Sequence, residues 1–368
     1  MPEEPSPKRT PFYDIHIRNN AKIVEFAGFL MPIQFKGIMD EHRRVRSTVG
    51  LFDITHMGEF EVRGKDALRF LQKMTTNDVS KLETNQVQYS CMCYDDGGIV
   101  DDLLVYRLPS HYMLVVNASN IDKDFRWLED HVSRGVTLEN VSDETALLAL
   151  QGPEAEKVLT QLTDVDLSNL RFYWSAFGKV ASIDMLFSRT GYTGEDGFEL
   201  YTQPQNAERL WYALVDAGKR FDIEPIGLGA RDSLRLEMKY MLYGNDIDQT
   251  TDPLEAGLGW VVKLDTGDFI GREPILKMKK DGLKRKLVPF ILKGKGFPRK
   301  GYEIHKDDKK IGFVTSGTFS PSLEKGIGLG YVTVEHSTKG EELDIIIRGK
   351  PEKAEIIKPP FYKDFTHK

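Results

Sequence analysis

The chain has 368 residues, a formal net charge of −6 and a hydrophobic content of 40%. This composition is typical of a globular protein with well-formed cores, and its length predicts more than one domain, because domains usually hold roughly 100–200 residues. Cys91 and Cys93 are too few for a disulfide framework and have no metal-ligand spacing around them. With no apolar signal core and no apolar run of membrane-spanning length, we expect a cytoplasmic protein without a membrane partner.

The charge is unevenly distributed. Residues 277–310, called the basic stretch below, contain thirteen Lys or Arg and four Asp or Glu. Such a stretch can attract anionic partners, although a solvated surface is the more common reason for it. It has only three aromatic residues for stacking on bases and no known nucleic-acid-binding module, so we expect no nucleic-acid partner.

The N-terminal half predicts a mixed α+β layer. Residues 1–13 carry four prolines and few apolar anchors, which indicates a flexible lead-in. Apolar, β-branched runs then predict a three-stranded meander over 86–94, 99–107 and 112–117. Apolar residues at helical spacing predict a helix over 121–132. This order of elements favours antiparallel pairing with a helix against the sheet.

A second mixed region follows, from about 141 to 250. Its predicted elements are a strand over 146–152, a helix that starts at Pro153, a strand that ends at Ser188, and helices over 205–217 and 227–242. From about residue 284 the pattern changes to alternating apolar runs joined by tight turns, which predicts a separate all-β domain.

Two adjacent carboxylates, Asp101 and Asp102, lie inside the apolar run of the middle predicted strand. Side chains alternate along a strand, so the two must face opposite ways, and one is expected to face an apolar interior. An unpaired buried carboxylate is costly and has a raised pKa, and such a group often acts on a ligand. From these residues alone, an Asp that forms a structural pair is an equally open interpretation.

A glycine-rich segment covers residues 189–200, where Gly191, Gly194 and Gly197 recur every third residue. This spacing suits neither a helix nor a strand core and predicts a tight loop whose backbone closely approaches another group. Glu199 follows the loop and could bind a planar amidine-like edge, as in a pterin or guanine, through two parallel hydrogen bonds. The alternatives are a plain hairpin and a Ca²⁺-binding turn. The segment lacks the series of oxygen ligands that a Ca²⁺-binding turn needs.

Common catalytic motifs are missing from the sequence. We find no dinucleotide fingerprint after a strand, no phosphate-binding P-loop, no nucleophile elbow and no zinc-protease motif. His56 stands alone beside a predicted strand, so we expect it to pack or hydrogen-bond rather than to catalyse. We expect no metal.

A series of motifs carries a family resemblance. In chain order they are FDITHMGEF, TTNDV, GGIVDDLLVYR, VVNASN, ALQGP, RTGYTGEDGFEL, GLGARDSLRLEM, LYGNDID, FIGRE and GFVTSGTFSP. Together, over about residues 10 to 360, they closely resemble the aminomethyltransferases (T-proteins) of the glycine cleavage system. That family transfers a methylene carbon from the aminomethyl-lipoyl arm of H-protein to tetrahydrofolate. The products are 5,10-methylenetetrahydrofolate, ammonia and the dihydrolipoyl carrier.

The resemblance implies an α+β fold in which three domains form a cloverleaf around a folate channel. Residues 1–50 and 141–250 would form the first α+β domain. Residues 51–140 and 251–275 would form a second, ferredoxin-like one, and residues 276–368 a barrel-like β domain. It also implies tetrahydrofolate as acceptor substrate and lipoylated H-protein as partner. We expect a monomer.

The resemblance implies site residues as well. Asp101 would be the catalytic residue, oriented toward folate. Glu199 matches the pterin-binding glutamate, and Arg231 matches an arginine that would contact folate at its glutamyl carboxylate. Further expected pocket residues are Tyr192, Asn117, Met57 and Tyr89, with Tyr240 and Trp260 as candidates for the wall.

Two positions depart from the family pattern. Many members have a small residue where this chain has Lys239, and Tyr362 lies near a position where some members have a folate-contacting tyrosine. The rival functions are a related folate-dependent demethylase acting on a small substrate, a flavin-linked oxidase, and a folate protein for iron–sulfur assembly. The flavin domain and the cysteine motif that the last two need are missing here.

Overall fold

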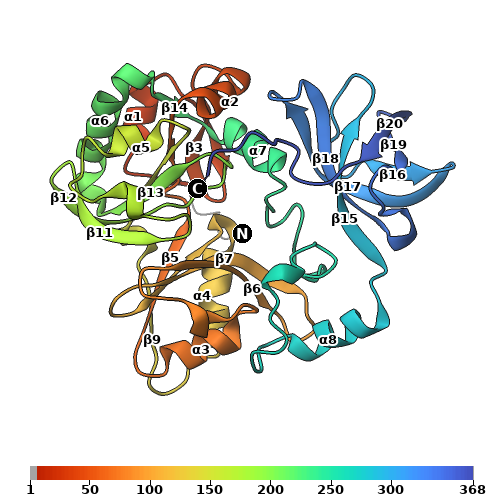
Figure 1. Cartoon of the computed structure of the whole chain (residues 1–368), viewed down its shortest axis with the longest axis horizontal. Coiled ribbons are helices and arrows are strands. Elements are labelled where there is room, and N and C mark those ends of the chain that lie inside the picture. Colours follow the sequence, from red (N-terminus) through yellow and green to blue (C-terminus); the bar gives the residue numbers. More distant parts are fainter. Residues whose placement is uncertain (1–5, 368) are drawn as a thin grey trace.

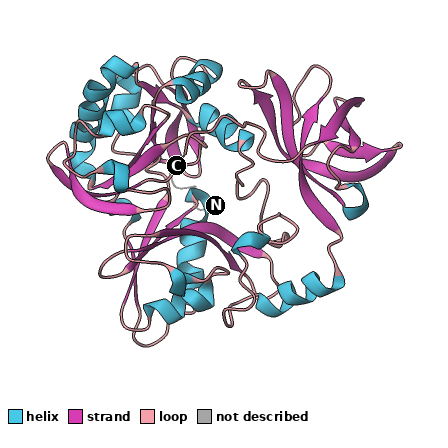
Figure 2. Ribbon diagram, in the orientation of Figure 1, coloured by secondary structure: helices cyan, strands magenta, loops and turns pink. Residues whose placement is uncertain are grey.

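The computed structural model describes residues 6–367, which form three lobes around a common centre (Figure 1). Each lobe is built on its own β-sheet or barrel (Figure 2). The fold is therefore the expected α+β arrangement with a third, all-β lobe. Among the described residues, no helix is both long and apolar enough to cross a membrane.

The first lobe contains a six-stranded sheet whose order is β11-β12-β13-β10-β4-β14. Its strands are β4 (Gly50–Asp53), β10 (Ala146–Gln151), β11 (Ser175–Val180), β12 (Ile183–Ser188), β13 (Gly197–Thr202) and β14 (Glu224–Ile226). Strand β4 comes from the N-terminal part of the chain and pairs with β10, almost a hundred residues later. The first two lobes are thus interleaved in sequence.

The helices of this lobe are α1 (Tyr13–Arg18), α2 (Ile38–Ser47), α5 (Ala155–Leu159), α6 (Ala207–Gly218) and α7 (Leu228–Glu237). A small sheet joins β1 (Lys8–Arg9), β3 (Phe29–Gln34) and β2 (Lys22–Phe26). The prediction of a flexible lead-in is wrong for residues 6–13: Phe12 is fully buried, and Thr10 donates a hydrogen bond to Asp53 at 2.6 Å. Residues 1–5 lie outside the described part.

The second lobe contains an antiparallel five-stranded sheet, β6-β7-β8-β5-β9. Its strands are β5 (Gly58–Arg63), β6 (Val87–Cys93), β7 (Ile99–Arg107), β8 (Tyr112–Val116) and β9 (Thr137–Asn140), with helices α3 (Ala67–Met74) and α4 (Ile121–Glu129). The predicted meander corresponds to β6, β7 and β8. Residues from 262 to 278, including the start of α8 (Arg272–Asp281), pack on this lobe through Cys93.

The third lobe is a closed barrel, β15-β18-β17-β16-β19-β20. Its strands are β15 (Arg285–Leu292), β16 (Glu303–Lys306), β17 (Lys309–Ser320), β18 (Lys325–Thr333), β19 (Glu342–Ile347) and β20 (Lys350–Ile356). After β20 the chain leaves the barrel and runs back to the first lobe, which places the C-terminus near the centre of the molecule (Figure 1). The basic stretch therefore extends from α8 across three barrel strands.

Helix α7 is shorter than the sequence predicts. It ends at Glu237 instead of continuing to 242, because Lys239 adopts a left-handed conformation with φ of 61° that a right-handed helix cannot contain. The residues after the turn, including Tyr240, are thereby directed away from the helix axis and toward the centre of the molecule. The exact domain boundaries stay a prediction.

Candidate active site

A cavity of about 820 Å³ lies between the sheets of the first two lobes. One wall is a cross-strand row of Tyr89, Leu104 and Val115, and the opposite wall is a row of Phe52, Ala149 and Glu199. Residues paired across neighbouring strands share one face of a sheet, so each row presents all its side chains to the cavity. Mostly apolar walls with a few polar groups are typical of a small-molecule site.

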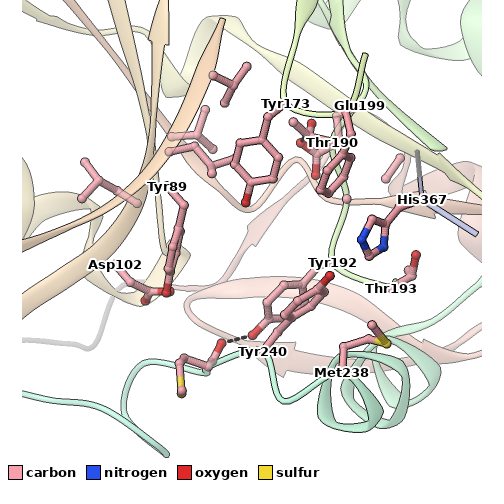
Figure 3. Close-up of a pocket in the computed structure, with 18 of the residues that line it drawn as sticks. Tyr89, Asp102, Tyr173, Thr190, Tyr192, Thr193, Glu199, Met238, Tyr240 and His367 are labelled. Atoms are coloured by element: carbon pink, nitrogen blue, oxygen red, sulfur yellow. Dashed lines mark hydrogen bonds between the residues drawn. The ribbon is translucent and has the colours of Figure 1, made fainter. Parts of the chain in front are cut away.

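Asp102 lies in this cavity beside Tyr89 (Figure 3). Its Oδ2 accepts a hydrogen bond from the Tyr89 hydroxyl, and its Oδ1 accepts one from Asn117 Nδ2, both at 2.8 Å. Burial, and next the charge of Asp101, raise the pKa of Asp102 to about 7, although the two hydrogen bonds oppose this shift. A carboxyl group with such a pKa can both accept and return a proton near neutral pH.

Asp101 does not face the cavity, so the prediction that it points to the ligand side and Asp102 away is wrong. On β7, Asp102 shares a face with Leu104, whereas Asp101 shares the other face with Val105, which belongs to the core under α4. Asp101 is fully buried and accepts hydrogen bonds from Asn117 N at 3.0 Å, Asn117 Nδ2 at 2.9 Å and Asn120 Nδ2 at 2.7 Å. Asp101 therefore stabilises the cavity wall from the face of the sheet that packs against α4.

Glu199 lies across the cavity from Asp102, beside Thr190 and Tyr173 (Figure 3). Its Oε2 accepts a hydrogen bond from the Thr190 hydroxyl at 2.5 Å. Burial raises the pKa of Glu199, while this bond and the charge of Arg231 oppose the rise. The Tyr201 hydroxyl, a hydrogen-bond partner of the same carboxylate, opposes the rise as well.

The glycine-rich loop packs closely, as the sequence predicts. An added Cβ at Gly191 would lie 2.0 Å from Gln151 Oε1, and Gly194, with φ of 86°, would place one 2.5 Å from Met238 Sδ. The acidic residues of the loop form ion pairs with arginines. Glu195 Oε1 lies 2.8 Å from Arg46 Nη1, and Asp196 Oδ2 lies 2.5 Å from Arg189 Nη2. The loop is thus held rigidly against the cavity.

A stack of aromatic rings supports a cation on the cavity wall. The Tyr192 and Tyr240 rings are stacked with centroids 5.6 Å apart (Figure 3), and the guanidinium of Arg231 lies 4.5 Å from the Tyr192 centroid. Tyr192 also donates a hydrogen bond to the Met241 carbonyl. The Arg231 guanidinium has no hydrogen bond or ion pair with any described residue, and burial lowers its pKa. It is a cation without a fixed anion.

The mouth of the cavity is marked by Trp260. Its ring is stacked on Tyr89 with centroids 5.7 Å apart, and 61% of the residue is exposed. On another side the C-terminal segment, residues 358–367, covers the glycine-rich loop, and Phe365 and His367 line the cavity. Thr366 holds the segment in place by donating to Glu195 Oε2 at 2.5 Å.

Eight of the nine predicted site residues line this cavity. They are Met57, Tyr89, Asn117, Tyr192, Glu199, Arg231, Tyr240 and Trp260. Tyr362 is not among the lining residues; its ring lies 4.1 Å from the Arg46 guanidinium.

Sequence reasoning missed Asp102, which the alternation argument left open, and His367, for which no local sequence signal exists. Among residues 6–367 no group of three or more His, Cys, Asp or Glu could hold a metal ion.

His56 is fully buried, and neither ring nitrogen has a hydrogen-bond partner among the described residues. Its ring packs edge-on against Phe26 with centroids 5.5 Å apart. Burial lowers the pKa of His56 to about 3, and the charge of Arg231 adds to the shift. The imidazole is therefore neutral, in agreement with the expected packing role.

A buried, mostly apolar cavity that contains a carboxyl group of near-neutral pKa is typical of an enzyme that uses general acid–base catalysis. Comparison with known proteins makes this class specific. The model of the GCVT N-terminal domain matches residues 12–266, and that of the glycine cleavage T-protein C-terminal barrel domain matches residues 285–363. The chain belongs to the glycine cleavage T-protein family.

Similar proteins cover nearly the whole chain. An aminomethyltransferase of Porphyromonas gingivalis is 55% identical over 361 residues, which cover 97% of this chain and 100% of that protein. One of Caldanaerobacter subterraneus subsp. tengcongensis is 52% identical over 359 residues, covering 97% and 96%. The crystal structure of glycine cleavage system aminomethyltransferase T from Bartonella henselae matches with a TM-score of 0.92 at 34% identity, covering 98% and 99%. The chain is thus an aminomethyltransferase of this system, and the demethylase alternative is not favoured.

Proposed function

We propose that the cavity binds tetrahydrofolate as acceptor and that Asp102 is the acid–base group of the methylene transfer. In the overall reaction, the methylene carbon leaves the lipoyl sulfur and the amino nitrogen of the carrier arm and becomes bonded to two folate nitrogens. The two protons displaced from those nitrogens end on the sulfur and on ammonia. A group at the site must move protons between these atoms. The proposal depends on Asp102, because a carboxyl group with a pKa of about 7 can accept and return a proton near neutral pH.

The neighbours of Asp102 fix the orientation of its carboxylate. Tyr89 and Asn117 each donate to one oxygen of the carboxylate, so the group is held in one orientation at the cavity wall. With an acid–base group in a fixed position, the methylene transfer requires no protein nucleophile and no large movement of the protein. Holding the reactants close together in an enclosed site lowers the activation barrier of the transfer. Asp101 fixes Asn117 from behind and acts as a positioning residue.

Glu199 and Arg231 would hold the acceptor rather than take part in the chemistry. A pterin ring presents two neighbouring N–H donors, and a carboxylate can accept both through parallel hydrogen bonds. Glu199 is suited to this role because its carboxylate lies on the cavity wall, where a ligand can approach it. Arg231, which has no anionic partner within hydrogen-bonding distance, is a second contact for the ligand.

The donor in this proposal is the lipoylated H-protein, whose arm would enter past Trp260 at the exposed mouth. The basic stretch offers positive charge for steering an acidic carrier. We further propose that the enzyme acts in the cytoplasm as a monomer and has no nucleic-acid partner.

A reconstituted assay tests the proposal. Purified protein is mixed with aminomethylated H-protein, with tetrahydrofolate, or with both, and ammonia release is followed. We expect rapid release only when both are present. Equal release without folate, or with a free small-molecule amine in place of the carrier, would contradict the proposed acceptor or the proposed donor, respectively.

A further inference from the structure

Lys239 occupies a conformation that is unfavourable for a lysine. Its φ of 61° lies in the left-handed region, where the Cβ of any residue other than glycine is strained. The turn places it on the cavity wall immediately after α7. Residues held in such conformations are concentrated at functional sites, where the surrounding structure maintains them.

The Lys239 ammonium has no partner. Among the described residues, no carboxylate or carbonyl lies within hydrogen-bonding or ion-pair distance of it. Nζ lies beside Gly257, 3.0 Å from the point that a Cβ there would occupy. Burial lowers the pKa of Lys239 while the charge of Asp246 opposes this, but Asp246 is already bound to Arg235 at 2.7 Å. An unpaired, half-buried cation is costly to maintain.

The other charges in the cavity do not compensate for it. Asp102 and Glu199 already accept hydrogen bonds from Tyr89, Asn117 and Thr190. Arg231 affects the pKa of Glu199 and therefore lies toward that end of the cavity. Lys239 instead lies beside Gly257, three residues before Trp260 at the exposed mouth.

We propose that Lys239 binds a carboxylate of the glutamyl tail of folate. The inference rests on the proposed function and extends it to the recognition of the tail. With the ring at Glu199, the tail would extend toward the mouth, where Lys239 provides the free cation. This residue, rather than Arg231, would then distinguish ligands that carry a glutamyl group from those that lack it.

Binding measurements with two ligands test this inference. The ligands are tetrahydrofolate and tetrahydropteroate, which lacks the glutamyl group, and calorimetry under anaerobic conditions gives each Kd. We expect Lys239→Met and Lys239→Gly to weaken tetrahydrofolate binding by roughly 10-fold or more, as for a lost charge-assisted hydrogen bond. Binding of tetrahydropteroate should change by less than about 2-fold, because it has no group for the lysine to bind.

Arg348→Gly is the matched control. Arg348 is an exposed cation with φ of 51° in the turn between β19 and β20, so the change also removes one positive charge and relieves a left-handed residue. It should leave both Kd values unchanged. The melting temperature of Lys239→Gly should equal or exceed that of the wild type, which shows that weaker binding does not come from unfolding.

Three outcomes would overturn the inference while leaving the proposed function intact. The Lys239 variants could bind tetrahydrofolate as tightly as the wild type, or they could lose both ligands equally. Alternatively, only the KM for H-protein could rise, which would place the anion on the carrier. A wild-type protein that binds neither ligand would instead refute the proposed function itself.

Discussion

Asp101 and Asp102 are adjacent on β7, but their carboxylates occupy different environments. Asp102 faces the cavity, whereas Asp101 faces α4 and accepts three N–H bonds. We predict that Asp102→Asn lowers kcat by about 10²-fold or more, on the scale of a lost acid–base group, with little change in melting temperature. Asp101→Asn should lower the melting temperature, because an amide cannot accept all three bonds. Wild-type kcat in Asp102→Asn would refute the assignment.

The raised pKa of Asp102 also predicts a pH dependence of stability. The ordinary pKa of an aspartate is 3.8, and in the folded protein that of Asp102 is about 7. Between these values the folded state binds more protons than the unfolded state, so the contribution of this group to stability falls as pH rises. We expect urea unfolding to show that the stability of wild type relative to Asp102→Asn decreases from pH 4.5 to pH 7.5. A pH-independent difference would show that this pKa is not shifted.

Glu199 is predicted to hold the acceptor. Glu199→Gln keeps the shape of the side chain but removes the charge, and we expect it to weaken tetrahydrofolate binding by roughly 1–3 kcal/mol. Calorimetry measures the change, and Glu61→Gln, on strand β5 of the second lobe and outside the cavity lining, is the control. Unchanged affinity in both Glu199→Gln and Arg231→Met would refute the binding role.

At the scale of elements, the cavity depends on segments that are distant in sequence. The C-terminal segment is fixed to the glycine-rich loop at two residues. The Thr366 hydroxyl also accepts a hydrogen bond from Asp196 N at 3.0 Å, and His367 Nδ1 lies 2.9 Å from the Gly194 carbonyl oxygen. Helix α7 is fixed to the barrel, since Arg235 donates to Ser316 at 2.9 Å. The barrel thereby helps to position both the helix and the segment that line the site.

We predict that Thr366→Val loosens this contact. The change removes the hydroxyl but keeps the shape, so amide exchange of residues 191–196 should become faster and tetrahydrofolate should bind more weakly by about 0.5–1.5 kcal/mol, the scale of one hydrogen bond. Hydrogen-exchange mass spectrometry and calorimetry provide the two measurements. Thr84→Val, at an exposed threonine, is the control. Unchanged exchange would show that the segment does not order the loop.

At the scale of the whole molecule, the basic stretch is predicted to steer the carrier. Lys284 and Lys286 are exposed, whereas Arg285 between them is bound to Glu255 at 2.7 Å and supports the structure. We expect the KM for H-protein to rise with salt, because exposed charges are screened beyond about 8–10 Å at physiological ionic strength. Replacing Lys284 and Lys286 by Glu should raise KM further and leave kcat nearly unchanged. If the KM responds to neither change, these lysines only solvate the surface.

The sequence by itself determined the elements whose signals are local. The apolar, β-branched run of β7 and the turns around it predicted the meander, because strand propensity and turn residues depend on neighbours in the chain. The glycine spacing predicted a loop in close contact, and the ordered motifs indicated the family and eight of the nine predicted cavity residues.

Only the tertiary structure decided which groups meet. Strand alternation separates Asp101 from Asp102 but cannot say which face is covered by α4, and so the catalytic candidate changed. The end of α7 at Lys239 and the return of His367 to the cavity depend on long-range packing, since no local pattern marks either. The pKa of Asp102 likewise follows from burial and from neighbouring charge, which exist only in the folded protein.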